Sequence, residues 1–295
     1  MTGRTLITIL AAGLIGLAGC GQPSAVPATA ASAPATGPAP RLDDWRVLGM
    51  GGGGTTRMVK VSPHDPDLMV AQSDMTCAFV SENGGASWRM FNLLDGVNAL
   101  AFDAADPAVI YAGNQALWRS ADRGRTWSMV FPAPAAVKDL VWVTDDAECH
   151  LRTDDPLYPG SWRRITAILA GPGGKLLAAW DGDPPAVLAG ADRGVTWRSL
   201  PLKEFKAGGV IGMFAHPGRY NEGIVAVIVR AGGVYAESAK RTVRNPGPAG
   251  LALTAADAAP DPLTGELVLY AATPVTWKDG VMQGGLYVTR DYGST

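Results

Sequence analysis

Residues 120–127 read Ser-Ala-Asp-Arg-Gly-Arg-Thr-Trp, a pattern that recurs along the chain. The other copies are residues 81–88 (Ser-Glu-Asn-Gly-Gly-Ala-Ser-Trp), 190–197 (Gly-Ala-Asp-Arg-Gly-Val-Thr-Trp) and 289–295 (Thr-Arg-Asp-Tyr-Gly-Ser-Thr). The shared form is Ser-x-Asp-x-Gly-x-Thr-Trp. The last copy stops one residue before its Trp, so we expect the unit that contains it to be truncated.

The pattern has the chemistry of a tight turn. The Asp or Asn side chain accepts backbone N–H bonds within the turn, and Gly takes the positive φ that other residues resist. The Trp begins the next strand and buries a large ring. Each copy therefore predicts a β-hairpin loop, and the residues expected to build these loops are Ser81, Asn83, Gly85, Trp88, Ser120, Asp122, Gly124, Trp127, Asp192, Gly194, Trp197, Asp291 and Gly293.

The spacing of the pattern predicts a repeat protein. Trp88, Trp127, Trp162 and Trp197 are separated by 39, 35 and 35 residues, and short apolar segments precede most of the copies. Such a period, with strands and turns every ten residues or so, is typical of propeller blades. We predict an all-β β-propeller with four-stranded blades. About six units begin, the third around Trp162, the fifth with 237–242 in place of its loop, and the last truncated.

The loop pattern resembles the Asp-box, or bacterial neuraminidase repeat. That repeat occurs in sialidases, in the xyloglucan-degrading glycoside hydrolases of family 74, in sortilin-type receptors and in some photosystem assembly factors. In those families it lies on the outer turn between the third and fourth strands of a blade, away from the active site. The resemblance therefore implies a structural role for Asp122, Asp192 and Asp291.

Residues 51–79 are similar to the first blade of the family 74 glycoside hydrolases. In that blade, a Gly-rich strand and a Pro-containing turn lead into Thr-Asp-x-Gly-Gly-Ala-Tyr, whose Asp is one of two catalytic carboxylates. Asp74 is the matching residue here, whereas the Gly-Gly pair is replaced by Thr76 and Cys77, and the Tyr by Phe79. The resemblance implies a glycan substrate, with Asp74 as a catalytic residue.

Other interpretations stay open at this point. Asp74 can equally be a turn-capping residue, and the loop acids Asp145, Asp146, Asp181 and Asp183 show no motif for a second catalytic carboxylate. A sialidase would need a cluster of Arg residues and a Tyr–Glu pair. The early Arg-Ile-Pro motif of sialidases is absent, and we can assign no Arg triad. A non-enzymatic propeller, in which one face binds a protein or a glycan, is the main alternative.

The N-terminal 43 residues differ from the rest of the chain. An apolar run follows Arg4 and ends in Leu-Ala-Gly-Cys at residues 17–20, which resembles the bacterial lipobox. The resemblance implies lipidation at Cys20. We expect a signal peptide over 1–20, a Pro/Ala-rich tether over 21–43 and the propeller over 44–295, held by its lipid at a membrane of the bacterial cell envelope, outside the cytoplasm.

The composition indicates neither nucleic-acid binding nor a cofactor. The formal net charge of the whole chain is −2, so no basic footprint for nucleic acid is present. No phosphate-binding or dinucleotide-binding pattern occurs. The three His residues and the two remaining Cys residues lack metal-ligand spacing, so we expect no metal site. Glycan is the expected partner, and a protein partner stays open.

Overall fold

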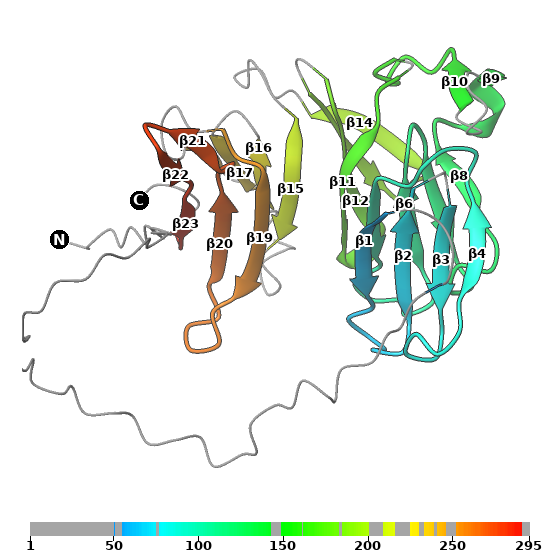
Figure 1. Ribbon diagram of the computed structural model, residues 1–295. Coiled ribbons are helices and arrows are strands. Elements are labelled where there is room, and N and C mark those ends of the chain that lie inside the picture. The colour runs from blue at the N-terminus through cyan, green and yellow to red at the C-terminus, as the bar shows by residue number, and fades with distance from the viewer. Residues whose placement is uncertain are drawn as a thin grey trace, which may run out of the picture.

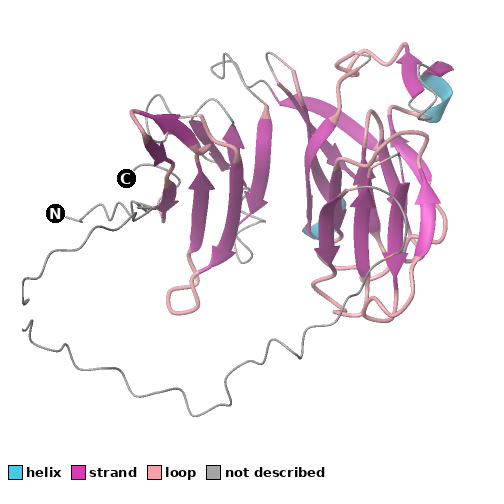
Figure 2. Ribbon diagram, viewed as in Figure 1, coloured by secondary structure: helices cyan, strands magenta, loops and turns pink. Residues whose placement is uncertain are grey.

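The structure is a computed structural model that describes residues 50, 55–74, 77–142, 149–160, 162–182, 185–200, 209–215, 225–229, 233–238, 241–245 and 252–290. Within these residues the protein is built almost entirely of antiparallel strands, with two 3₁₀ turns, η2 (Pro134–Ala136) and η3 (Pro172–Gly174) (Figure 2). The all-β prediction is therefore confirmed. None of the described segments is a helix with the length and apolar character needed to cross a membrane.

Four sheets have four strands each, and a fifth has three. The strands of blades 1 and 2 are β1 (Thr56–Val61), β2 (Met69–Ser73), β3 (Cys77–Ser81), β4 (Arg89–Asn92), β5 (Ala99–Phe102), β6 (Ile110–Gly113), β7 (Leu117–Ser120) and β8 (Ser128–Phe131). Those of blades 3 and 4 are β11 (Ile165–Gly171), β12 (Lys175–Trp180), β13 (Ala186–Ala191), β14 (Thr196–Leu200), β15 (Val210–Ala215), β16 (Val225–Val229), β17 (Gly233–Ser238) and β18 (Arg241–Asn245). Blade 5 contains β19 (Ala255–Pro260), β20 (Leu267–Ala272) and β23 (Leu286–Thr289).

The blades are arranged radially, as a propeller requires (Figure 1). Within each blade the strands follow chain order from one edge to the other. From blade 2 onward, the first strands of successive blades contact one another, β5 with β11, β11 with β15 and β15 with β19. These first strands therefore form the inner edge of the arc, and the fourth strands form its outer edge.

One of the counted units is not a blade. The residues around Trp162 were expected to form the third unit, but the described segments there make only a two-stranded sheet of β9 (Val137–Trp142) and β10 (Cys149–Thr153). Blade 2 packs directly on blade 3, since β11 contacts both β5 and β6. The described residues therefore form five radial sheets rather than six. A second two-stranded sheet, β21 (Thr276–Lys278) with β22 (Val281–Gln283), is inserted into blade 5.

Aromatic rings join each blade to the one before it. Trp127, which follows the repeat loop of blade 2, stacks on Phe91 of blade 1 with ring centroids 4.8 Å apart. Trp197 of blade 3 packs at the corresponding place on Phe131 of blade 2, with the ring planes tilted by 56° and the centroids 5.3 Å apart. A Cβ atom added at Gly124 would lie 2.8 Å from the Val80 side chain, so the loop needs glycine at this close approach. The repeat loops are thus part of the junctions between blades.

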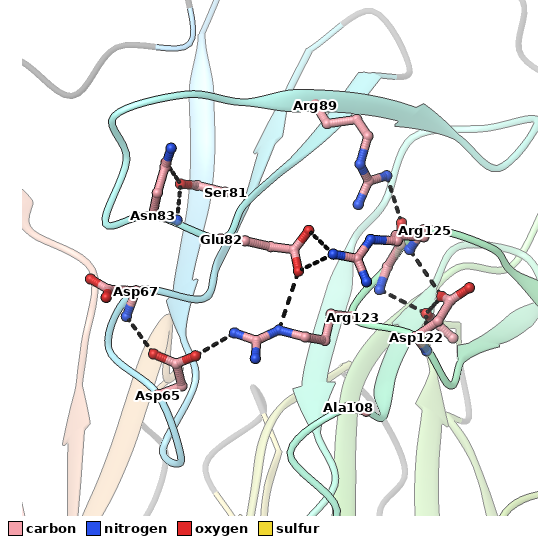
Figure 3. Close-up of polar contacts among 12 residues, drawn as sticks. Asp65, Asp67, Ser81, Glu82, Asn83, Arg89, Ala108, Asp122, Arg123 and Arg125 are labelled. Carbon is pink, nitrogen blue, oxygen red and sulfur yellow. Dashed lines mark hydrogen bonds and ion pairs between the residues drawn. The ribbon is translucent and has the colours of Figure 1, made fainter.

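Ion pairs reinforce these junctions, and Figure 3 shows those between blades 1 and 2. Asp65, in the turn between β1 and β2, pairs with Arg123 in the repeat loop of blade 2. Asp106 of blade 2 pairs with Arg193 in the repeat loop of blade 3, with 3.6 Å between Nη2 and Oδ2. The same contact is therefore made at two successive junctions. Glu82 adds to the first junction by accepting a hydrogen bond from Arg125 at 2.9 Å.

Strand direction separates two ends of the propeller. The turns between first and second strands and the repeat loops between third and fourth strands share one end, which we call the loop end. The loops between second and third strands and the connections from one blade to the next share the other, the connection end. The β9–β10 sheet, which lies in the connection from blade 2 to blade 3, protrudes there (Figure 1), and the β21–β22 sheet emerges from a loop between second and third strands.

Candidate functional site

The repeat loop of blade 2 forms a closed network of hydrogen bonds. The Ser120 hydroxyl donates to Asp122 Oδ1 at 2.8 Å and accepts the Gly124 N–H at 2.7 Å. Asp122 accepts the Thr126 N–H at 2.8 Å and the Thr126 hydroxyl at 2.6 Å. The Trp127 indole N–H donates to the Gly124 carbonyl at 3.2 Å. The carboxylate is therefore used within its own turn, at the loop end.

The repeat loops of blades 1 and 3 vary this network. In blade 1, Asn83 accepts the Ser87 N–H at 2.9 Å and Ser81 accepts the Gly85 N–H at 2.8 Å, as in blade 2. In blade 3 the Trp197 indole still donates to the Gly194 carbonyl at 2.9 Å. The Asp192 carboxylate, however, accepts no hydrogen bond within the described part of the chain. Gly190 replaces the Ser that would contribute the hydroxyl, and Asp192 takes a positive φ of 52°.

One backbone contact is common to all three loops. The fourth residue of each loop donates its N–H to a carbonyl in the turn between the first and second strands of the same blade. The three pairs are Gly84 to Asp67 at 3.0 Å, Arg123 to Ala108 at 2.9 Å and Arg193 to Gly174 at 2.8 Å. Each repeat loop is therefore hydrogen-bonded to the neighbouring turn of its own blade at the loop end, which fixes the loop in a structural role.

Asp74 lies at the opposite end of blade 1. It directly follows β2 and is half-buried. Its N–H donates to the Thr55 carbonyl at 3.0 Å, and its Oδ2 accepts the Thr55 N–H at 2.9 Å. Because Thr55 precedes the first strand, Asp74 lies at the inner edge of blade 1, at the connection end.

Asp181 occupies the same position in blade 3. It directly follows β12, its N–H donates to the Arg164 carbonyl at 2.9 Å, and its Oδ1 accepts the Arg164 N–H at 2.7 Å. Arg164 directly precedes β11, just as Thr55 precedes β1. Asp74 and Asp181 therefore make the same pair of contacts, each closing the end of a first strand. Sequence reasoning had treated Asp181 as a loop acid without a motif.

A buried polar cluster links the connection ends of blades 1, 2 and 3. The Asp95 side chain is 3% exposed, accepts from Gln115 Nε2 at 3.0 Å and lies 3.7 Å from Arg164 Nη2. The Asn114 amide donates to the Leu93 carbonyl at 2.9 Å and accepts the Trp118 indole N–H at 3.1 Å. Asp95, Asn114 and Gln115 come from two different blades, and Arg164 comes from a third. The cluster therefore fixes the loops near Asp181.

A small apolar hollow adjoins this cluster, between blade 2 and the β9–β10 sheet. Its apolar lining includes Trp118, Met129, Leu140 and Leu151, and its polar edge includes Asp95, Asn114 and Gln115. In the part of the chain that the structure describes, no three His, Cys, Asp or Glu side chains gather in a way that could hold a metal ion.

Sequence reasoning missed the polar cluster. Asp95, Asn114 and Gln115 belong to no recurring pattern. Position was the one available signal for a site at this end of the blades. Asp74, Asn114 and Asp181 each directly follow the second strand of a blade. Cys20, Asp291 and Gly293 lie outside the described residues.

Comparison with solved structures shows the same fold in larger proteins. The chain is similar to the GH74 enzyme of Niastella koreensis (TM-score 0.59, 12% identity, 81% of this chain and 37% of that one). It is also similar to the GH74 xyloglucanase of Xanthomonas campestris (TM-score 0.55, 18% identity, 80% of this chain and 37% of that one). The chain thus spans little more than a third of these proteins. No protein-family model and no curated protein matches the sequence.

The network around Asp122 predicts a pH dependence of stability. Hydrogen bonds from the Thr126 side chain and backbone lower the pKa of Asp122 from 3.8 to about 2. A carboxylate whose pKa is lower in the folded protein stabilises it above the unfolded pKa and loses this effect as the pH falls through the folded pKa. We expect the stability difference between wild type and Asp122→Asn to shrink as the pH falls from about 4 to about 2.

Urea unfolding of both proteins across this pH range measures the difference. Asp192→Asn is the matched control, because that carboxylate accepts no hydrogen bond within the described residues. That substitution leaves the hydrogen bonds around Asp122 in place. A wild-type advantage over Asp122→Asn that stays constant down to pH 2 would contradict the assignment.

Proposed function

We propose that this protein binds or hydrolyses glycans at the connection end of the propeller and that Asp74 contributes a carboxylate there. The position of Asp74 carries the proposal. The residue lies at the inner edge of the first blade, away from the repeat loops, and matches a catalytic carboxylate in the sequence resemblance. The fold shared with the two GH74 enzymes supports the same class of function.

Glycoside hydrolysis places specific demands on such a site. It needs two carboxyl groups flanking the scissile bond, about 5–5.5 Å apart in retaining enzymes and about 6.5–9.5 Å apart in inverting ones. One protonates the leaving oxygen, and the other acts as nucleophile or activates water. Asp74 is proposed as one member of this pair. Its Oδ2 is held by the Thr55 N–H at 2.9 Å, so its direction is set before a glycan binds.

The second candidate function is a non-enzymatic propeller that binds a glycan or a protein. A specific observation favours it: Asp181 makes the same two backbone contacts as Asp74, in a blade where no catalytic role is proposed. Because the same contacts recur in two blades, closing the end of a first strand is enough to explain the presence of both residues, without a catalytic role. Asp181 therefore offers a matched control for Asp74.

The deciding experiment compares Asp74→Asn with Asp181→Asn in the complete protein. Hydrolysis of β-glucan and xyloglucan oligosaccharides is measured together with their binding by calorimetry and with urea unfolding. If Asp74 is catalytic, Asp74→Asn should lower turnover by about 10²–10⁴. Asp181→Asn should leave turnover close to wild type, and the two variants should lose similar stability.

The alternatives give different results. Equal turnover in the two variants would reduce Asp74 to a strand-closing residue. Binding of these glycans without hydrolysis by the wild type would favour the non-enzymatic propeller. If the wild type neither binds nor hydrolyses these glycans, the glycan proposal is wrong.

We also propose that the protein is exported and lipid-anchored through Cys20 outside the bacterial cytoplasm. The apolar run before Leu-Ala-Gly-Cys and the uncharged Pro/Ala-rich segment after it support this. Metabolic labelling with a palmitate analogue should mark the wild type and not Cys20→Ser. Equal labelling of both proteins, or no labelling of the wild type, would contradict the anchor.

A further inference from the structure

The repeat loop of blade 1 carries an amide where the other repeat loops carry a carboxylate. Asn83 stands at the position of Asp122, Asp192 and Asp291, and Gly84 follows it. Asn83 is the only Asn of the sequence that precedes a Gly. Its side chain is exposed at the loop end. The loop of blade 1 therefore has a chemistry that the other repeat loops lack.

An Asn that precedes a Gly can lose ammonia to its own backbone. The Gly nitrogen gives up its proton and attacks the Asn Cγ, so an N–Cγ bond forms and the Cγ–Nδ2 bond breaks. The amide leaves as ammonia after taking up a proton. Water then opens the five-membered succinimide at either of its two carbonyls, which gives Asp or isoaspartate. Gly favours the first step because it has no Cβ to keep its nitrogen away from the side chain.

The folded loop withholds the nucleophile. The Gly84 N–H donates to the Asp67 carbonyl in the turn between β1 and β2, at 3.0 Å. Loss of the proton breaks this bond and places a negative nitrogen against a carbonyl oxygen. Gly84 has a φ of +62°, and a Cβ atom there would lie 2.9 Å from Asp67 Oδ1, so the backbone is packed closely on the turn. The nitrogen can react only after the loop leaves this turn.

The carboxamide of Asn83 is held as well. Its Oδ1 accepts the Ser81 hydroxyl at 3.0 Å (Figure 3). The same oxygen accepts the Ser87 N–H at 2.9 Å, and Nδ2 donates to the Ser87 Oγ at 2.9 Å. Turning the side chain onto the Gly84 nitrogen breaks these bonds. Exposure to solvent therefore does not make this Asn reactive while the loop is folded.

The two products have opposite effects on the loop. An Asp at position 83 reproduces the loop of blade 2, where Asp122 accepts both the N–H and the hydroxyl of Thr126. Ser87 offers the same two groups in blade 1. Isoaspartate instead adds one carbon to the backbone between residues 83 and 84. This carbon displaces the Gly84 N–H from the Asp67 carbonyl.

The isoaspartate also affects the junction with blade 2. Glu82, the residue before Asn83, lies 2.9 Å from Arg125 Nη2 and 3.3 Å from Arg123 Nε. Both Arg residues belong to the repeat loop of blade 2. A longer backbone at residue 83 moves Glu82 relative to these partners, so this product weakens the contact between the two blades.

We propose that Asn83 is a deamidation site that the folded loop keeps closed and that opening of the loop releases. The rate in the native protein is then the rate in the unfolded chain multiplied by the fraction of time that the loop is open. The contacts that close the site all lie within residues 67–87 of blade 1, so the site is complete within one blade.

The test follows the complete protein over time in native buffer and in urea at the same pH and temperature. Mass spectrometry of the peptide that contains Asn83 separates its Asn, Asp and isoaspartate forms. In urea, Asn83 should react faster than Asn98, which precedes an Ala. In native buffer, the rate at Asn83 should be at least about tenfold lower than in urea, because the closed loop must open first.

Two substitutions test whether the loop sets the native rate. Ser87→Ala removes the acceptor of Asn83 Nδ2 at an exposed position, so the fold should be retained. It should raise the native rate by a few-fold to about tenfold, the effect of one hydrogen bond on the opening equilibrium, and leave the rate in urea unchanged. Thr196→Ala, at the same position of the blade 3 loop, is the matched control and should leave both rates at wild type.

Circular dichroism checks folding, and Ser81→Ala is a second variant that removes the hydrogen bond to Asn83 Oδ1. Three results would overturn the proposal. One is an equal rate at Asn83 in native buffer and in urea. Another is a rate in urea no higher than that of Asn98. The last is a native rate in folded Ser87→Ala and Ser81→Ala that equals that of Thr196→Ala.

Discussion

The docking of each repeat loop on the preceding blade is the contact on which the rest of the propeller depends. A single blade has two apolar faces and cannot bury both alone, so each needs a neighbour. The loop meets this need with a Trp ring, a Gly at the point of closest approach and, at two junctions, an Arg paired with an Asp. Hydrogen bonds within the loop hold these groups in position.

This division of labour explains why the candidate site lies at the other end of the blades. At the loop end, backbone and side chains are engaged in junctions and turns. At the connection end, the loops differ from blade to blade and include the β9–β10 and β21–β22 sheets. Asp74, Asp181 and the cluster around Asp95 lie there. The connection end is therefore where a specific ligand can be recognised without disturbing the junctions.

Much of the fold could be predicted from the sequence because the repeat loop is a local signal. Its Asp, Gly and Trp each have a physical role within eight residues, and the loops of blades 1 and 2 contain the hydrogen bonds of such a turn. The prediction of a blade around Trp162 was wrong, because it rested on the spacing of the Trp residues alone. Its strand β9 carries Lys138 and Asp139, which are exposed, so that strand cannot be buried between two blades.

The site was less predictable because its contacts join residues that are far apart in sequence. Asp95 pairs with Gln115 and approaches Arg164, and no local pattern connects these three. Asp74 was found through a resemblance to an enzyme family. Its equivalence to Asp181 became visible only when both were seen to bond the residue before a first strand.

A double-mutant cycle on Phe91 and Trp127 tests the role of the blade junctions most directly. Phe91→Leu, Trp127→Leu and the double variant are compared with wild type by urea unfolding. A pair of stacked rings should show a coupling of about 1 kcal/mol beyond its buried area. Phe91→Leu combined with Trp197→Leu, from a different junction, should be additive. Additivity of Phe91→Leu and Trp127→Leu within about 0.3 kcal/mol would contradict this account.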